Sequence, residues 1–409
     1  MLLDLLKEFR ILYLTGPRQA GKTTLVRSLA ELTGMEYITL DNQGILASIQ
    51  NDPYGFVQAL GTKKWIIDEF QYAPGLIPLI KASSDQLKPE EKGKYILTGS
   101  ADIFRSAKAA EALPGHMARV ELYPLSISEI YDHPNNMIDY LFAGNFQMLQ
   151  KPFISRESLA QRLINGGYPE VQTKSIRGKQ IWFRSYLEGR LFKDFETLYA
   201  ARGDYHSKLK ALAPYLAGLS GNLLKYASIS NDLSLDDKVV KTYIEILELM
   251  FIIKRVPSYL NNRSKRHVQN MPKIHMIDTG LACSLLGLQT PEHLSRSQYF
   301  GGLLESFIYM ELLKQNTWAT EPVDLYHFRD RKKNEVDIVM ERKNGQIIGV
   351  EVKASATITA EDFKGLFNLA DFSQKQFQYG ILFYSGQEIL PFHRDKISLY
   401  ALPIETLIT

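Results

Sequence analysis

A glycine-bounded loop near the start of the chain places a lysine next to a threonine, at a spacing that suits phosphate chemistry. The loop runs from Gly16 to Thr23, after the apolar run Ile11–Leu14 and before the helical pattern of residues 25–30. In a strand, loop and helix of this kind, backbone N–H groups converge on phosphate oxygens at the positive end of the helix. The bare pattern also arises by chance in ordinary turns, but the flanking strand and helix favour a phosphate site. The sequence therefore predicts that this chain binds a nucleoside triphosphate.

The residues of this loop have separate predicted roles. Lys22 is expected to reach the β- and γ-phosphates as a point charge and is counted among the catalytic residues. The Thr23 hydroxyl is expected to be a ligand of Mg²⁺. The predicted nucleotide-binding residues are Gly16, Pro17, Arg18, Gln19, Ala20, Gly21, Lys22, Thr23, Thr24 and Ser100.

An apolar strand that ends in two acids follows further along the chain. Trp65, Ile66 and Ile67 lead into Asp68 and Glu69. Asp68 is predicted to hold the magnesium ion through water, and Glu69 to orient or deprotonate the attacking water. An acid pair in this place is often only the polar start of a loop. Its position behind a fully apolar strand, downstream of the phosphate loop, favours hydrolysis of the nucleotide instead.

A second group of charged residues near the C-terminus has the order of a PD-(D/E)xK nuclease site. Glu305 lies on a helical pattern, Asp337 on a strand, and Glu351 and Lys353 on the next strand. Alternate residues of a strand point to the same face, so Glu351 and Lys353 are expected to lie together. Glu305, Asp337 and Glu351 would bind Mg²⁺, while Asp337, Glu351 and Lys353 would act in catalysis. The alternative is an edge hairpin whose polar residues form ordinary salt bridges.

The elements that position these residues alternate between strands and helices in the first part of the chain. This order predicts an α/β fold, with a P-loop NTPase parallel sheet whose ligand lies at the carboxyl ends of the strands. The expected strands are Ile11–Leu14, Tyr37–Leu40, Trp65–Ile67, Lys94–Leu97 and Met117–Leu122.

The remaining patterns divide the chain into four predicted domains. Residues 1–125 form the ATPase core, 126–205 a helical lid, 206–265 a winged helix-turn-helix, and 266–409 a nuclease-like α/β domain. The winged-helix prediction rests on a short helix at 228–233, a longer one at 235–250 and a strand at 251–256. Exposed Lys238 and Lys241 would face DNA, although such modules also bind proteins and two lysines make a weak DNA face.

Composition limits the classes of protein that remain. The 409 residues carry a net charge of +3, which is too small to argue for nucleic-acid binding from the whole chain. Basic clusters at 254–255, 263–267 and 329–333 are more often solvated surface, although the last would line a phosphate channel if nucleic acid is cut. The single cysteine, Cys283, excludes an intramolecular disulfide and a cysteine-based zinc site. Without an apolar run long enough to span a membrane, we expect a cytoplasmic protein with no membrane partner.

The chain resembles the bacterial and archaeal AAA-type P-loop ATPases that carry a C-terminal DUF4143 domain. The resemblance implies ATP and Mg²⁺ as cofactors and a homo-oligomer in which an arginine crosses between subunits. Relatives usually have Gly-Arg where this chain has Gly115 and His116. Arg105 or Arg119 could replace that arginine, although both equally suit surface charges. The motifs that carry the resemblance are Gly16–Thr23, Leu40–Asp41, Ile67–Gln71, Leu97–Ser100, Leu122–Ser126, Gly166–Glu170 and Ile277–Leu281.

The same resemblance implies roles for two turns. Thr98 and Ser100 would lie beside the γ-phosphate, although Gly99 and Ser100 also suit a plain tight turn. The Gly166–Pro169 turn would approach the nucleotide and report its state, although it also suits a simple break between lid helices.

Two functions are consistent with these observations. In the first, an ATP-hydrolysing protein delivers DNA or RNA to a C-terminal Mg²⁺-dependent nuclease. In the second, a nucleotide-regulated scaffold or switch binds a partner through its C-terminal domain without cleaving it. They differ in whether Asp337, Glu351 and Lys353 perform chemistry.

Overall fold

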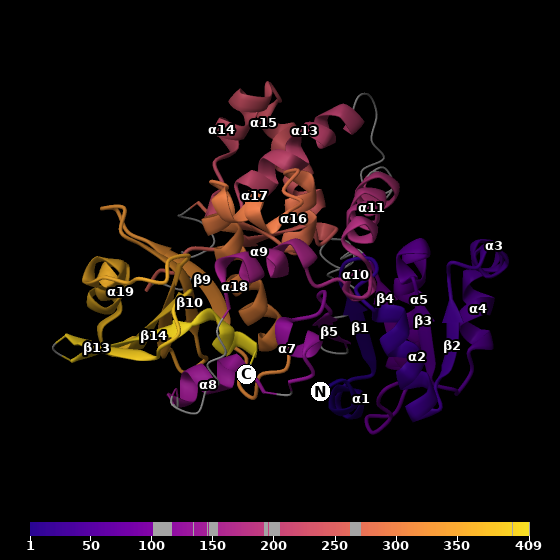
Figure 1. Ribbon diagram of the computed structural model, residues 1–409. Coiled ribbons are helices and arrows are strands. Elements are labelled where there is room, and N and C mark those ends of the chain that lie inside the picture. The colour runs from indigo at the N-terminus through magenta and orange to yellow at the C-terminus, as the bar shows by residue number, and fades with distance from the viewer. Residues whose placement is uncertain are drawn as a thin grey trace. The chain divides into compact units, whose positions relative to one another are not determined.

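The computed structural model of the protein (Figure 1) divides into two units. The first comprises residues 1–124 and 249–251, and the second comprises residues 125–248 and 252–409. The first unit contains one sheet and the second contains two. The structure describes residues 1–100, 117–133, 135–144, 146, 154–191, 195, 205–261, 271–394 and 396–408.

The first unit contains a five-stranded sheet in which every strand runs parallel to its neighbours. The strand order is β2-β3-β4-β1-β5, so β4 separates the strand before the phosphate loop from the strand that ends in the acid pair. The predicted α/β fold with a parallel sheet is confirmed. The strands are β1 (Ile11–Thr15), β2 (Glu36–Thr39), β3 (Trp65–Asp68), β4 (Tyr95–Gly99) and β5 (Met117–Glu121).

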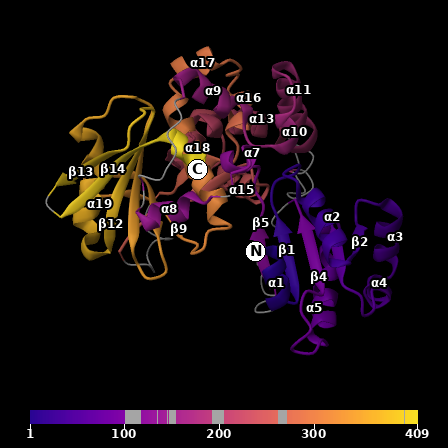
Figure 2. The ribbon, with the colours of Figure 1, turned by 60° about the horizontal axis from the view of Figure 1, so that its bottom comes forward.

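Alternation along the strands gives this sheet two apolar faces. Ile11 and Tyr13 of β1 belong to one buried cluster, and Leu12 and Leu14 belong to another. Both faces are covered by helices, and α3 and α4 lie beside the β2 edge in both views (Figures 1 and 2). The helices of this unit are α1 (Leu2–Glu8), α2 (Lys22–Thr33), α3 (Gln43–Asn51), α4 (Pro53–Ala59) and α5 (Ile77–Asp85).

The larger sheet of the second unit has six strands in the order β13-β14-β12-β11-β10-β9. The central strands β11, β12 and β14 are parallel, while β9, β10 and β13 pair antiparallel with their neighbours. Leu366 and Leu369 of α19 (Lys364–Ser373) pack into the apolar core of this sheet. The strands are β9 (Asp324–Arg329), β10 (Glu335–Glu341), β11 (Ile347–Lys353), β12 (Phe377–Tyr384), β13 (Leu390–Arg394) and β14 (Ile397–Pro403).

Helix α18 (Phe300–Asn316) is buried around most of its circumference, including the charged residues Glu311 and Lys314. Its sequence is apolar on nearly every side, as expected of a helix that other elements surround. The other helices of this unit are α7 (Ile127–Ile130), α8 (Met137–Ala143), α9 (Arg156–Asn165), α10 (Pro169–Gln172), α11 (Ile176–Tyr186), α13 (Tyr205–Gly218), α14 (Tyr226–Leu233), α15 (Asp237–Leu249), α16 (Thr279–Leu285) and α17 (Pro291–Arg296).

A small antiparallel sheet in the second unit crosses a predicted domain boundary. Its order is β6 (Asn222–Leu223), β8 (Lys273–Met276) and β7 (Ile253–Val256). Helices α14 and α15 followed by β7 match the predicted helix, helix and strand, while the winged-helix identity stays a prediction. Because β8 is the central strand, the sheet continues past the boundary placed at residue 265. The boundary at residue 205 also falls inside this unit.

Within the described part of the chain, no helix combines the length and the apolar character needed to cross a membrane. Cys283 is a buried free thiol.

Candidate functional site

The phosphate loop joins β1 to α2, and two of its glycines are required by the geometry. A Cβ atom on Gly16 would lie 1.9 Å from the backbone oxygen of Leu122, so no other residue fits there without movement. Gly21 has a φ of 99°, in the left-handed region that favours glycine, and it is the N-cap of α2. Since Gly21 has no side chain, α2 begins without a side-chain cap, as is suitable for an anion at its N-terminus.

Lys22 is folded back into the loop that it follows. Its side chain is buried, and Nζ donates hydrogen bonds to the backbone oxygens of Gly16 at 2.8 Å and Pro17 at 2.7 Å. The ammonium is therefore held in the concave side of the loop by neutral acceptors. A phosphate oxygen could replace such acceptors at a charge-assisted hydrogen bond.

Asp68 links the phosphate loop to the neighbouring strand ends. The Thr23 hydroxyl donates to Asp68 Oδ2 at 2.8 Å, and the Tyr37 hydroxyl donates to the same oxygen at 2.7 Å. The Thr98 hydroxyl donates to Asp68 Oδ1, and Asp68 is almost fully buried. A threonine hydroxyl and an aspartate carboxylate are the oxygen ligands with which nucleotide sites hold Mg²⁺, so these residues fit the ion.

Glu69 adopts a backbone conformation that is unusual for a residue with a side chain. Its φ and ψ are 57° and 40°, in the left-handed region, and its N–H donates to Thr98 Oγ1 at 3.2 Å. The Gln71 amide donates to the Glu69 carboxylate and, at 3.0 Å, to Ser100 Oγ. Ser100 N–H in turn donates to Gln71 Oε1 at 3.2 Å. The acid expected to activate water is thus tied to the predicted phosphate-sensing hydroxyls.

Sequence reasoning missed Tyr37 and Gln71 as members of this site. Burial, reinforced by the hydrogen bond to Asp68, raises the pKa of Tyr37, and the guanidinium of Arg27 lies 5.0 Å above its ring. Gln71 closely follows the acid pair, a position that offered a signal, whereas Tyr37 lies in a separate strand with no motif. Both hold carboxylates in place.

The arginine expected to act between subunits is only partly placed. Arg119 lies on β5 and forms an ion pair with Glu121 of the same strand. Arg105, Gly115 and His116 lie outside the described residues. An intersubunit role for either arginine stays a prediction.

The C-terminal carboxylates converge, as their spacing predicted. Glu305 comes from α18, Asp337 from β10 and Glu351 from β11, and all three side chains are partly buried and interact electrostatically. The backbone N–H of Val352 donates to Asp337 Oδ2 at 3.0 Å. The structure therefore brings the predicted acids into one cluster, which we call the carboxylate cluster.

Two lysines differ from the expected arrangement at this cluster. Lys353 forms its ion pair with Asp362, at 2.7 Å, and its side chain is 45% exposed, while Glu351 and Asp337 of the cluster act on it through their charge. Instead Lys273, which sequence reasoning missed, reaches in from β8. Its Nζ lies 2.7 Å from Glu305 Oε1 and 2.9 Å from Asp337 Oδ1. The cation of the cluster comes from a strand of the small sheet.

Burial and mutual charge shift the pKa values of this cluster apart. Burial raises the pKa of Glu305, with the negative Asp337 adding to the effect and Lys273 opposing it. Burial, followed by the charge of Asp337, raises the pKa of Glu351. Burial would also raise the pKa of Asp337, but the Lys273 ammonium overrides it and lowers that pKa. Burial opposes the charge of Lys273, yet Asp337 and Glu305 raise its pKa.

The carboxylate cluster does not fit a divalent metal ion as it is arranged. Among the residues that the structure describes, no group of three or more histidine, cysteine, aspartate or glutamate side chains is placed to hold a metal. The Lys273 ammonium takes oxygens of Glu305 and Asp337 that the predicted magnesium ion would need.

The glycine turn at 166–167 packs on an acid from another motif of the resemblance. Asp278 accepts hydrogen bonds from Gly167 N–H at 2.7 Å and from Leu281 N–H at 2.8 Å, so it caps α16 as well. Gly166 has a φ of 63°, and a Cβ there would lie 2.4 Å from Asp278 Oδ1. The turn therefore needs glycine in order to contact the buried Asp278 carboxylate. Its approach to a nucleotide stays a prediction.

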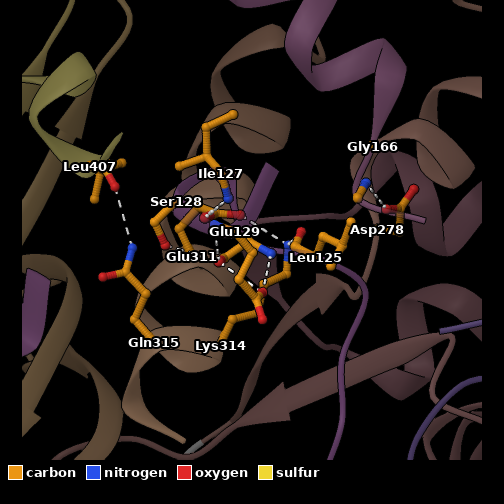
Figure 3. Close-up of polar contacts among 12 residues, drawn as sticks. Leu125, Ile127, Ser128, Glu129, Gly166, Asp278, Glu311, Lys314, Gln315 and Leu407 are labelled. Carbon is orange, nitrogen blue, oxygen red and sulfur yellow. Dashed lines mark hydrogen bonds and ion pairs between the residues drawn. The ribbon is translucent and has the colours of Figure 1, made fainter. Parts of the chain in front are cut away.

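The start of the second unit is hydrogen-bonded to this turn and to α18 (Figure 3). Leu125 N–H donates to Gly167 O at 2.7 Å, and Lys314 Nζ donates to Leu125 O at 3.0 Å. The Ile127 N–H donates to Glu311 at 2.6 Å, and Glu311 pairs with Lys314 at 2.9 Å. These residues line a cavity of about 70 Å³. The polar contacts within it belong to the packing of four chain segments.

Three families match separate parts of the chain. Residues 8–131 match an AAA domain, residues 156–292 a domain of unknown function (DUF8612), and residues 300–407 a domain of unknown function (DUF4143). Uncharacterized proteins of Mycobacterium bovis and Mycobacterium tuberculosis are each 27% identical over 349 residues, which is 85% of this chain and 71% of theirs.

Solved structures with a low overall likeness include a Walker-type ATPase of Pyrococcus abyssi and RuvB of Thermotoga maritima. The first is 16% identical, covers 69% of this chain and 93% of its own, and has a TM-score of 0.37. The second is 14% identical, covers 64% and 87%, and has a TM-score of 0.26. The fold assignment rests on the parallel sheet and the family match rather than on these likenesses. The AAA match covers the residues of the phosphate loop and the acid pair, and the DUF4143 match covers the three acids of the carboxylate cluster.

Proposed function

We propose that the chain binds ATP with Mg²⁺ at the loop of residues 16–23 and hydrolyses it. The observation that carries this proposal is the 2.8 Å hydrogen bond from Thr23 Oγ1 to Asp68 Oδ2. It places the two predicted magnesium-binding groups in contact, directly after Lys22. Bound magnesium would neutralise charge on the phosphates, and Thr23 and Asp68 are the residues that would hold it.

The chain's own residues would perform the remaining steps. The Lys22 ammonium would leave the Gly16 and Pro17 oxygens for the β- and γ-phosphates, and the N-terminus of α2 would add its backbone N–H groups. The Glu69 carboxylate, held by Gln71, would orient a water and accept its proton. Thr98 and Ser100, joined to the same network, would contact the γ-phosphate.

Steady-state ATP hydrolysis by the Glu69→Gln variant tests this proposal. We expect kcat to fall by about 10²- to 10⁴-fold, the usual contribution of a general base, while nucleotide binding is kept. Glu36→Gln is the matched control, since Glu36 is a half-exposed acid of the same sheet that pairs with Lys63. Unchanged turnover in Glu69→Gln would show that another group activates the water.

A second candidate activity is metal-dependent cleavage of DNA or RNA at the carboxylate cluster. The convergence of Glu305, Asp337 and Glu351 favours it. The Lys273 ammonium on two of these acids and the pairing of Lys353 with Asp362 oppose it. Plasmid nicking under Mg²⁺ or Mn²⁺ that disappears in Asp337→Asn, but not in the exposed-residue control Asp324→Asn, would support cleavage. Without such nicking, the C-terminal domain is better described as the partner-binding part of a nucleotide-regulated switch.

Assembly of several copies is a separate part of the proposal. The AAA match supports a homo-oligomer in which nucleotide sites meet neighbouring subunits. Native mass measured with and without a non-hydrolysable ATP analogue tests it. A single-chain mass under both conditions would contradict it.

A further inference from the structure

We propose that Lys273 is a built-in counter-cation that occupies the cation position of the carboxylate cluster and keeps divalent metal ions out. The inference does not depend on the proposed ATP hydrolysis. It starts from two ion pairs, because Lys273 Nζ lies 2.7 Å from Glu305 Oε1 and 2.9 Å from Asp337 Oδ1. The lysine side chain is only 3% exposed.

The backbone of Lys273 is anchored on both sides. Lys273 lies in β8, the central strand of the small sheet, where it pairs with Leu223 of β6 and with Val256 of β7. Beside it, Leu224 N–H donates to Pro272 O at 2.8 Å. The two neighbouring strands fix the backbone of Lys273, and burial with two ion pairs holds its ammonium in the folded core.

The other carboxylate oxygens also have close neighbours. Asp337 Oδ2 accepts the Val352 N–H at 3.0 Å, so both oxygens of Asp337 are engaged. A Cβ on Gly221 would lie 3.1 Å from Glu305 Oε2, and one on Gly365 would lie 2.4 Å from Glu351 Oε1. Backbone therefore approaches the acids closely from two sides, and the lysine approaches them from another.

A divalent ion would have to compete for the same oxygens. It would need direct contact with the carboxylates that already hold the ammonium, which would bring two cations together in a buried place. Lys353 cannot offset the added positive charge of a metal ion by moving away, because its ammonium is already paired with Asp362. We infer that the cluster is closed to metal as long as residue 273 carries its charge.

Binding of Mn²⁺ to the nucleotide-free full chain, counted by electron paramagnetic resonance, tests this inference. The Asp68→Asn background removes the predicted metal group of the phosphate loop, so that only the second unit is tested. We expect this background to bind no Mn²⁺ at the cluster. Adding Lys273→Met, which keeps the length of the side chain but removes its charge, should create about one Mn²⁺ site per chain. Its affinity should be at least about tenfold tighter than any Mn²⁺ binding by the background.

Three further variants make the result specific. Lys273→Arg keeps a cation and should bind no Mn²⁺. Lys314→Met removes another buried lysine, which is paired with Glu311 rather than with the cluster, and it should also gain no site. Adding Asp337→Asn to Lys273→Met should abolish the new site. Mn²⁺ should also raise the unfolding temperature of Lys273→Met and leave that of Lys273→Arg unchanged.

Two results would overturn the inference. One is Mn²⁺ binding to the Asp68→Asn background that is lost when Asp337→Asn is added, because metal would then bind beside Lys273. The other is a folded Lys273→Met chain, judged by cooperative unfolding, that gains no site. If Lys273→Met does not fold, Mn²⁺ binding is compared between the Asp68→Asn background and the same background with Asp337→Asn. Equal and negligible Mn²⁺ binding in both supports the inference.

Discussion

Two buried lysines, one in each unit, illustrate opposite uses of an internal positive charge. Lys22 of the phosphate loop is 5% exposed and donates to the backbone oxygens of Gly16 and Pro17. Lys273 of β8 is 2% exposed and donates to the carboxylates of Glu305 and Asp337. The two side chains are equally hidden, but one contacts neutral acceptors and the other contacts ionisable acids.

This difference distinguishes Lys22, whose charge is available to an anionic ligand, from Lys273, whose charge is already neutralised by acids. Carbonyl oxygens are exchanged for a phosphate with a gain in charge interaction, so burial of Lys22 prepares it for an anion. Carboxylates can be separated from Lys273 only by leaving charges uncompensated in the core. Residue types alone do not distinguish the two cases, whereas the identity of the partners does.

The largest effect on the free energy of unfolding should come from removing Lys273. Lys273→Ala leaves Glu305 and Asp337 partly buried without their cation, and breaking a buried pair in this way costs about 3–5 kcal/mol of unfolding free energy. Urea unfolding in metal-free buffer measures the loss. A change below about 1 kcal/mol, the range typical of exposed pairs, would show that the cluster does not depend on Lys273.

Removing Lys22 should affect binding instead of folding. Lys22→Ala deletes the charge directed at the phosphates, and we expect ATP affinity to fall by about 100-fold, or about 3 kcal/mol. Titration with a fluorescent ATP analogue measures this, and Lys7→Ala, at an exposed position of α1, is the control. Equal affinities for the wild type and Lys22→Ala would remove the contrast between the two lysines.

The charge of Lys273 should also appear in the response to acid. Burial, and then the Lys273 charge, lowers the pKa of His327 to about 3, while the unfolded value is 6.5. A depressed pKa gives stability that is present above pH 6.5 and is lost as the pH falls. By pH 5 the loss assigned to His327 is about 2 kcal/mol. Unfolding at pH 7 and pH 5 should therefore differ more for the wild type than for His327→Gln, and equal differences would contradict this assignment.

The smallest effect should come from the lysine that the motif predicted. Lys353 and Asp362 form a pair in which the lysine side chain is 45% exposed, so Lys353→Ala should cost less than about 1 kcal/mol. Urea unfolding beside Lys273→Ala makes the comparison direct. A loss for Lys353→Ala equal to that for Lys273→Ala would place Lys353 in the cluster after all.

Local patterns predicted the structural elements that lie along one stretch of chain. The phosphate loop, the acid pair after β3 and the parallel sheet follow from spacing and alternation, because each depends on neighbours in sequence. The convergence of Glu305, Asp337 and Glu351 also followed, since a helix and a hairpin have few ways to place those positions. Tyr37 was missed because its contact with Asp68 depends on which strands are adjacent.

Long side chains set the limit of that reasoning. Strand alternation placed Glu351 and Lys353 on one face, but a lysine chooses among the acids within its reach, and Asp362 is one of them. Lys273 lies far from the cluster in sequence and on a strand of another sheet, so no spacing rule selects it. The counter-charge of a buried group is determined by tertiary packing, which a motif does not contain.

We propose that the loop at 16–23, together with Asp68, binds ATP and magnesium. Isothermal titration calorimetry of ATP into the wild-type chain with Mg²⁺, repeated on Lys22→Ala, tests it most directly. We predict binding heat with about one ATP per chain for the wild type and none for Lys22→Ala at the same concentrations. Absence of binding heat in the folded wild-type chain would contradict the account.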